Sequence, residues 1–480
     1  MKTRKESDFL GEMEVPEDAY YGIFTVRASS TFKLSGQMAN PEFVRAVIVI
    51  KKAAALANKK LGMLEAGKAD AITKAADEAL AGKYDNQFII DAFQAGAGTP
   101  THMNVNEVLA NRANEILDGE KGKYDKVHPN NHVNMSQSSN NVMPSAVRIA
   151  CVKLSKKLAI EMELLENEFR KKADRYSKTM KCGRTHLMDA VPMTYGQMFG
   201  AYAEAIDSET TNLERSLEKA RELGIGGTAT GTGITAHPEF RKTIVAEINK
   251  IENNNDTGIE GEWYVPAKDP VEKTQSMNDL LFVSGVMRNY ASTLNRIAND
   301  LRLLGSGPNA GITEIKLPAI EPGSSIMPGK VNPSIPEAVN MICWQVCGND
   351  RTIELAAQSG QLELNFGAPI IAHNLLQSLV LLTNGTRLFR EECIEGMEVD
   401  EERTKSLLEG TFAQATALNP YLGYSLVSKL VTESQKNGIP IKELVLQKRL
   451  MEKNDLEKVL SVSGPAITDS KILERVRKQK

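Results

Sequence analysis

The amino-acid sequence predicts a mainly α-helical protein built around a central bundle of very long helices. Apolar residues recur with the helical period over five long stretches, which are residues 145–179, 192–222, 274–304, 335–363 and 370–393. Helical patterns of this length that lack internal caps are typical of bundles. In addition, 41% of the residues are apolar and 25% are charged, which is the balance of a folded protein.

Shorter elements precede the bundle. Residues 1–40 contain Pro16 and several glycines, and we expect them to be irregular. Helical periodicity then begins, with apolar side chains on one face at Val44, Val47, Ile48, Ile50, Ala54 and Leu56. Residues 118–143 contain Asp-Gly and Pro-Asn-Asn turns, and they predict a loop ahead of the first long helix.

The rest of the chain completes a three-domain prediction. After Asn419-Pro420 the pattern changes to shorter helices, and the basic tail at 471–480 is expected to be a frayed end. The expected domains are a mixed, mostly helical N-terminal domain at 1–141, a central long-helix bundle at 142–395 and a small helical domain at 396–480. Helices as long as those of the bundle often bury a second face against other subunits.

Composition and charge exclude several classes of protein. Lys and Arg number 58 and Asp and Glu 61, so there is no basic surplus for nucleic acid or an anionic membrane. The N-terminus lacks the apolar segment of a secretory signal, and the longest uncharged apolar run, Leu375–Leu382, is too short to span a bilayer. Five scattered cysteines favour a reducing cytoplasm over a disulfide scaffold.

Four polar or glycine-rich segments interrupt the helices, at residues 96–104, 134–141, 183–189 and 323–333. Each offers hydroxyl, amide and backbone N–H donors, and donor-rich loops near a lysine suit a small dicarboxylate. The glycines of the fourth segment favour a mobile loop that closes over a substrate. The alternative interpretation is caps and turns, which fits Ser138 and Ser139 equally well because they precede a long helix.

The fourth segment, GSSIMPGKVNP (323–333), resembles the signature loop of the aspartase/fumarase superfamily. Further stretches resemble that superfamily's characteristic regions in the same order, namely AGAGTPTHMNVNEVLANR, HVNMSQSSNNVMPSAVRIA and GRTHLMDAVPMTYGQ. The resemblance runs from about residue 8 to about residue 465. It implies the superfamily's three-domain fold, a cofactor-free lyase that forms fumarate from a small dicarboxylate, and a homotetramer whose active sites are shared between subunits.

The resemblance also implies residue roles. Ser324 would be the general base that removes a Cβ proton and gives an aci-carboxylate intermediate. Asn140 and His186 would lie near the leaving group, and Glu337 would polarise His186. Two sets of donors would hold the carboxylates, which are Thr99, Ser138, Ser139 and Ser325 for the β-carboxylate and Thr185, Lys330 and Asn332 for the α-carboxylate.

Within the superfamily, two activities compete. AAQSGQLELN (356–365) and residues 444–462 read more like aspartases, whereas TALNP (416–420) and Ser138-Ser139 read more like fumarases. The balance favours reversible deamination of L-aspartate to fumarate and ammonia. The alternatives are hydration between fumarate and L-malate, a lyase for a substituted aspartate, and a non-catalytic member of the superfamily.

Some positions depart from the family pattern. This chain has His102 where the family usually has Asn and Asn141 where it usually has Asp. It has Met188 in place of the usual Gln and Asn309 in place of the usual Arg. His102 and Met188 flank expected substrate contacts, so they bear on the substrate more than on the chemistry. An apparent insertion near 253–264 is expected to be a surface loop. No metal site is readable, because Cys343 and Cys347 have no further ligands nearby and are expected to be core cysteines.

Overall fold

The structure is a computed structural model that describes residues 2–253, 261–464 and 468–479. The chain forms two compact units. The first comprises residues 1–161, 209–292 and 341–384, and the second comprises residues 162–208, 293–340 and 385–480. The division into three domains at 141 and 395 stays a prediction. Most of the surface loop predicted at 253–264 lies outside the described residues.

The first unit opens with an antiparallel hairpin of β1 (Thr3–Asp8) and β2 (Gly11–Pro16), followed by α1 (Ile23–Thr31). Val15 of β2 and Ile23 of α1 pack in one apolar cluster. The prediction that residues 1–40 are irregular is therefore wrong. Strand β1 reads TRKESD, which has no alternation of apolar residues, so it is held by backbone pairing with β2 and gives no periodic signal.

Several helices and short strands complete the first unit. They are α2 (Pro41–Lys60), α3 (Ala66–Leu80), η1 (Asp85–Gln87), α4 (Thr99–Ile116), η2 (Pro129–Val133), β5 (Glu222–Leu223), α7 (Phe240–Asn253), β6 (Val265–Pro266) and α8 (Pro270–Gln275). Helix α2 starts where its sequence favours a start, because Asn40 accepts a hydrogen bond from the N–H of Glu42 and Pro41 occupies the first turn. Of the six apolar residues predicted on one face, five are buried and Leu56 is half-buried.

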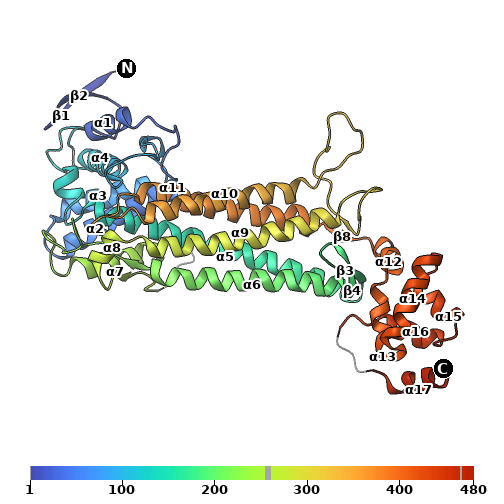
Figure 1. Cartoon of the computed structure of the whole chain (residues 1–480). Helices are drawn as coiled ribbons and strands as arrows, with labels where there is room; N and C mark the ends of the chain where they lie inside the picture. Colours follow the sequence, from blue (N-terminus) through green and yellow to red (C-terminus); the bar gives the residue numbers. More distant parts are fainter. Residues whose placement is uncertain (1, 254–260, 465–467, 480) are drawn as a thin grey trace. The chain divides into compact units, whose positions relative to one another are not determined.

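Five long helices contribute residues to both units (Figure 1). They are α5 (Ser139–Arg175), α6 (Tyr195–Ala220), α9 (Asn278–Leu304), α10 (Ser334–Ala357) and α11 (Ala368–Phe389). Each coincides with one of the five predicted long patterns, with its ends displaced. The mainly α-helical fold with a core of long helices is thus confirmed.

Side-chain contacts show that these helices pack against one another within each unit. In the first unit, the hydroxyl of Ser284 in α9 donates to Asp350 in α10 over 2.6 Å. In the second unit, the ring of Phe169 in α5 contacts Phe199 and Tyr202 of α6 at centroid distances of 6.3 and 5.6 Å. No helix among the described residues combines the length and apolar character that crossing a membrane requires.

The second unit adds small strands and short helices. They are β3 (Met180–Thr185), β4 (Met188–Thr194), β7 (Ile315–Lys316), η3 (Arg390–Ile394), β8 (Glu398–Val399), α12 (Glu401–Glu409), η4 (Ala413–Leu418), α13 (Asn419–Leu422), α14 (Tyr424–Asn437), α15 (Ile441–Gln447), α16 (Lys453–Leu460) and α17 (Ser470–Gln479). The antiparallel β3–β4 hairpin was not predicted from the sequence, and it carries the third polar segment.

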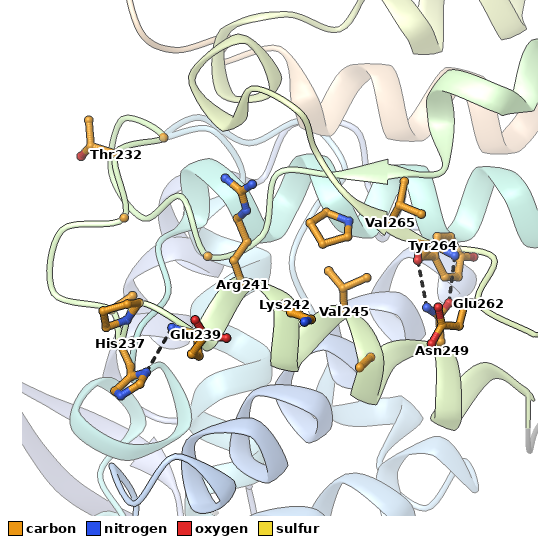
Figure 2. A pocket seen from close by; sticks show the side chains of 17 residues that line it. Thr232, His237, Glu239, Arg241, Lys242, Val245, Asn249, Glu262, Tyr264 and Val265 are labelled. Carbon is orange, nitrogen blue, oxygen red and sulfur yellow. Dashed lines mark hydrogen bonds between the residues drawn. The ribbon is translucent and has the colours of Figure 1, made fainter.

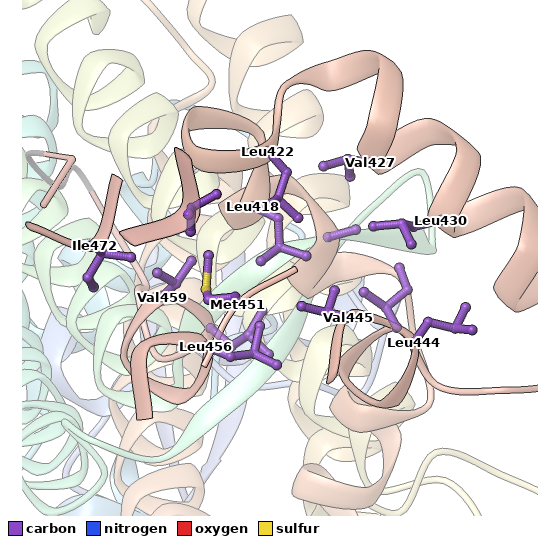
Figure 3. Close-up of a cluster of buried hydrophobic side chains, with 14 residues drawn as sticks. Leu418, Leu422, Val427, Leu430, Leu444, Val445, Met451, Leu456, Val459 and Ile472 are labelled. Atoms are coloured by element: carbon purple, nitrogen blue, oxygen red, sulfur yellow. The ribbon is translucent and has the colours of Figure 1, made fainter. Parts of the chain in front are cut away.

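The C-terminal helices share one apolar cluster, in which Leu418, Leu444 and Leu456 meet (Figure 3). Ile472 and Val476 of α17 join it with only 1% of each side chain exposed. The prediction of a frayed basic tail is therefore wrong. The two apolar residues lie four positions apart and therefore share one helix face. The many Lys and Arg residues around them make this apolar face hard to recognise in the sequence.

The cysteine prediction holds for one residue only. Cys343 is buried, as expected of a core cysteine, but Cys347 is exposed in the single chain. On the same helix, α10, the single chain also exposes 61% of Met341 and 61% of Trp344. An apolar helix face left open in this way is typical of a surface that another chain covers.

Candidate active site

Thr99 and Ser139 lie together in the first unit. Thr99 opens α4, and its hydroxyl lies 2.9 Å from the hydroxyl of Ser139, the first residue of α5. The preceding Gly98 has a φ of 85°, and an added Cβ there would lie 2.9 Å from the Cε of Met143. Glycine at this position therefore lets α4 start close against α5, which brings two residues far apart in sequence into contact.

Ser138 and Asn140 flank Ser139 and have other local partners. The hydroxyl of Ser138 accepts the N–H of Asn140 at 3.2 Å, which is the capping contact that the alternative interpretation expects. The amide of Asn140 donates to the carbonyl of Ala229 at 2.8 Å, and the amide of the buried Asn141 donates to the carbonyl of Thr228 at 3.1 Å. In the single chain these two amides fix the glycine-rich loop around residue 228.

The signature loop lies in the second unit and closes on itself at its base. The N–H of Gly323 donates to the carbonyl of Lys330 at 2.8 Å, and the amide of Asn332 donates to the carbonyl of Gly323 at 2.7 Å. An added Cβ on Gly323 would lie 2.7 Å from the oxygen of Lys330, so only glycine fits there. The closed base holds Gly323, the residue before Ser324, against Lys330 and Asn332, while the tip is exposed, with Ile326 83% accessible.

Ser324 is the predicted base, and its hydroxyl oxygen faces two backbone donors. It accepts the N–H of Ile326 at 3.2 Å and the N–H of Met327 at 3.0 Å. Two backbone donors aimed at one side-chain oxygen would stabilise negative charge on that oxygen. The same pair of hydrogen bonds also occurs in serine turns, and the geometry is compatible with the role of a base.

Thr185 and His186 sit at the tip of the β3–β4 hairpin. Thr185 pairs with Met188, and the two residues between them form the turn. His186 has a φ of 57° and Leu187 a φ of 62°, the backbone required at both positions of a tight type I′ turn. Such turns usually contain glycine or asparagine, so the tip holds backbone strain, and it presents His186 to solvent.

Glu337 occupies the first turn of α10, also in the second unit. Its carboxylate lies 3.4 Å from the guanidinium of Arg302 on α9. Its pairing with His186 stays a prediction. The predicted residues thus divide between the units, with Thr99 and Ser138–Asn140 in the first and the remaining seven in the second.

A buried cluster next to Ser139 was not predicted from the sequence. The ammonium of Lys51, which is fully buried, contacts Nε2 of His102 and donates to Asn134 and Gln137, each at 2.9 Å. Nδ1 of His102 lies 2.8 Å from the hydroxyl of Ser139. The sequence carried a signal, because a lysine at 51 falls on the apolar face of α2, four residues after Val47.

A cavity of about 590 Å³ lies elsewhere in the first unit, beside α7 (Figure 2). Arg241 and Lys242 line it, together with the glycine-rich loop at 226–233. None of the predicted site residues is among its lining residues. Among the described residues, no three His, Cys, Asp or Glu side chains gather as ligands for a metal ion.

Comparison with known proteins decides the family. A family model described as "Lyase" matches residues 11–348, and one described as "Fumarase C C-terminus" matches residues 415–464. The aspartate ammonia-lyase of Bacillus subtilis (strain 168) is 43% identical over 475 residues, which are 98% of each chain. The chain belongs to the aspartase/fumarase superfamily.

Other members of the superfamily are similar to the same degree. A class II fumarate hydratase of Halalkalibacterium halodurans is 42% identical over 461 residues, 96% of this chain and 98% of the relative. The crystal structure of a class II fumarase from Schistosoma mansoni superposes with a TM-score of 0.92 at 34% identity, covering 97% of this chain and all of that one. The membership predicted from the sequence is confirmed, and the chain is an enzyme of this lyase family.

Proposed function

We propose that the chain catalyses the reversible deamination of L-aspartate to fumarate and ammonia. The observation that carries the proposal is the hydroxyl of Ser324, which accepts two backbone N–H groups on an exposed loop. A Cβ–H beside a carboxylate is a very weak acid, so its removal needs a strong base whose charge is stabilised. The two N–H donors, with Lys330 on the same loop, supply that stabilisation.

The proposed reaction has two steps. Ser324, as an alkoxide, takes the Cβ proton, and the electron pair moves into the β-carboxylate to give an aci-carboxylate. The pair then returns to form the Cα–Cβ double bond, and the Cα–N bond breaks with its electrons leaving on ammonia. Charge peaks on the β-carboxylate, so hydroxyl donors such as those of Thr99 and Ser139 act mainly on the intermediate.

The other predicted residues complete the proposal. Ser138 and Ser325 join Thr99 and Ser139 at the β-carboxylate, and Thr185, Lys330 and Asn332 hold the α-carboxylate. Asn140 and His186 face the leaving group, and Glu337 polarises His186. No cofactor takes part. The strain at the hairpin tip supports a functional role for His186, because a strained turn that lacks glycine is retained only where the surroundings demand it.

The proposal also names ammonia, and not water, as the leaving group. Relatives named aspartate ammonia-lyase and a relative named fumarate hydratase share 42–43% identity with this chain, so identity alone does not separate them. The aspartase-like stretch at 356–365 favours ammonia over water as the leaving group. A substituted aspartate is the third candidate, because Met188 beside the hairpin tip is 69% exposed and departs from the family pattern.

We further propose that the enzyme is a cytoplasmic homotetramer whose active sites combine residues from different subunits. The support is apolar surface left open on the long helices of the single chain, which includes 58% of Phe282 in α9 and 61% of Trp344 in α10. Large exposed aromatic residues on helix faces are typical of obligate interfaces. Sedimentation of the active enzyme as a monomer would contradict the assembly.

The first experiment follows the ultraviolet absorbance of fumarate when purified enzyme is given L-aspartate or, in parallel, L-malate. Fumarate with an equal amount of ammonia from aspartate alone is the expected result. Fumarate from malate alone would replace the proposal with a hydratase. No fumarate from either substrate, with the assembly intact, would favour a substituted succinate or a non-catalytic role.

A further inference from the structure

His102 and Lys51 form a buried polar cluster that reaches the predicted machinery. His102 is 1% exposed and Lys51 is not exposed at all. The cluster joins α2, α4 and the turn before α5, and it ends at the hydroxyl of Ser139. A charged lysine is rarely buried without a specific purpose, because its desolvation is costly.

The hydrogen-bond partners fix the tautomer of His102. Burial lowers the pKa of Lys51 well below its usual value, but the two amide oxygens of Asn134 and Gln137 and the imidazole of His102 surround Nζ and favour the ammonium form. An ammonium group has three donors and no acceptor, so Nε2 of His102 must accept, as the oxygens of Asn134 and Gln137 do. Burial, together with the charge of Lys51, lowers the pKa of His102 well below its usual range, which keeps the imidazole neutral. A neutral imidazole has one N–H, and it must therefore sit on Nδ1.

The tautomer in turn fixes the direction of the next hydrogen bond. Nδ1–H of His102 donates to the oxygen of Ser139 over 2.8 Å. The oxygen of Ser139 also accepts the hydroxyl of Thr99 at 2.9 Å, so the proton of Ser139 itself is available to a bound carboxylate. The hydroxyl of Thr99 also reaches the carbonyl of Gly96 at 2.7 Å. The hydrogen bonds thus run in one direction, from the ammonium of Lys51 through the imidazole of His102 to the hydroxyl of Ser139 at the start of α5.

We propose that His102 is a positioning residue of the dicarboxylate site, which takes its tautomer from Lys51 and turns the hydroxyl proton of Ser139 toward the substrate carboxylate. This inference rests on the proposed function, in which Ser139 holds the carboxylate that gains charge. The opposite tautomer would place an N–H against the ammonium of Lys51 and would draw the proton of Ser139 inward, away from the substrate.

Two isosteric variants test the two ends of the imidazole separately. In His102→Asn the side-chain NH2 occupies the position of Nδ1 and can still donate to Ser139. In His102→Gln the amide oxygen occupies the position of Nε2, so this variant keeps only the hydrogen bond from Lys51. We expect H102Q to lower kcat/KM by about ten- to hundredfold, the size of a lost hydrogen bond to a charged group. H102N should retain most of the activity.

A second background shows whether His102 acts through Ser139. In an enzyme that already carries Ser139→Ala, H102Q should change kcat/KM far less than it does in the wild type, because the hydroxyl it orients is gone. Equal losses in both backgrounds would overturn the proposal. So would equal losses in H102N and H102Q, or a fall in melting temperature without a change in kcat/KM.

The tautomer can be read without any variant. Selective ¹⁵N labelling of the six histidines distinguishes a protonated Nδ1 from a protonated Nε2 by chemical shift. We expect the Nδ1–H form for the one buried histidine that contacts a lysine, and an Nε2–H form or an imidazolium would contradict the inference. Wild-type enzyme that forms fumarate from neither substrate would refute the proposed function, whereas active enzyme with the wrong tautomer would refute only the role of His102.

Discussion

At the scale of single residues, the proposed chemistry depends on the small number of groups that contact each reactive side chain. Ser324 is an ordinary serine apart from the two N–H groups that face its oxygen. His186 is an ordinary surface histidine apart from the left-handed turn that presents it. In both cases the backbone conformation positions the group, which is why a loop and a tight turn carry them. Lys330 and Glu337 are the proposed side-chain partners.

The first prediction concerns Ser324. Ser324→Ala removes the proposed base, so kcat should fall by about 10²- to 10⁴-fold while the melting temperature stays unchanged. Ser325→Ala, next to it in sequence, should lower kcat only by about ten- to hundredfold, because Ser325 is one of several donors to the β-carboxylate and is not the base. Steady-state kinetics on both variants checks this, and an S324A enzyme with near-normal kcat would exclude serine as the base.

The second prediction concerns stability and pH at Asp91. Burial alone raises the pKa of Asp91, but the N–H of Phe93, the hydroxyl and N–H of Ser35 and the N–H of Gly36 together lower it to about 2. A carboxylate whose pKa is lowered by folding stabilises the protein above its ordinary value of 3.8 and loses that contribution as pH falls toward 2.

Asp91→Asn should therefore destabilise the protein by about 1–3 kcal/mol at neutral pH. The side-chain NH2 of the asparagine would face the N–H and hydroxyl donors that the carboxylate now accepts. The difference from the wild type should shrink as pH falls from about 4 toward 2. Denaturant unfolding of both proteins across this range measures it. Asp70→Asn is the control, since the side chain of Asp70 is 62% exposed and should give a small difference at every pH. A D91N difference that grew at low pH would contradict the assignment.

At the scale of elements, buried charges connect the long helices. Arg148 of α5 holds Asp279 of α9 with two hydrogen bonds of 2.7 and 2.9 Å, and Lys273 of α8 adds a third at 3.1 Å. The side chains are 0%, 6% and 6% exposed. Charges so deeply buried are stable only as a set, because each one alone would be costly to remove from water.

The third prediction follows from this set. Asp279→Asn leaves two buried cations without a countercharge, so we expect a loss of about 3–5 kcal/mol. Glu354→Gln breaks the exposed pair with Arg351 and should cost no more than about 1 kcal/mol. Chemical denaturation at one fixed protein concentration compares the two variants. Similar losses in both would show that the buried set is not what holds α5, α8 and α9 together.

At the scale of the whole molecule, the two groups of predicted residues belong to different compact units of the chain. Ser139 lies in the first unit and Ser324 in the second. The proposed sharing of active sites between subunits makes this division testable, because the two groups of one site would come from different chains.

The fourth prediction is complementation. S139A and S324A should each have low activity, but mixed tetramers refolded from both should regain native sites, about a quarter of the total when subunits combine at random. Activity measured before and after co-refolding checks this, and each variant refolded alone is the control. If the mixture stays as inactive as its parents, each site is built from one chain and the shared-site proposal fails.

Sequence patterns identified the long helices because an amphipathic helix repeats its apolar residues whatever surrounds it. They failed for β1, whose TRKESD has no alternation, and for α17, whose two apolar residues are hidden among basic ones. They also failed for the β3–β4 hairpin, because its turn, His186-Leu187, contains none of the residues that usually mark such turns. Each of these elements exists because of what it pairs with or packs against.

The sequence by itself determined the superfamily, the class of reaction and the identity of the candidate side chains, because a signature loop and the order of the motifs are linear properties of the chain. Only the tertiary structure decided how those side chains are prepared. The two N–H groups on Ser324, the closed base of its loop and the contact of His102 with Lys51 all join residues through space. Lys51 and His102 lie far apart in sequence, and burial makes the direction of one hydrogen bond depend on the charge of another residue.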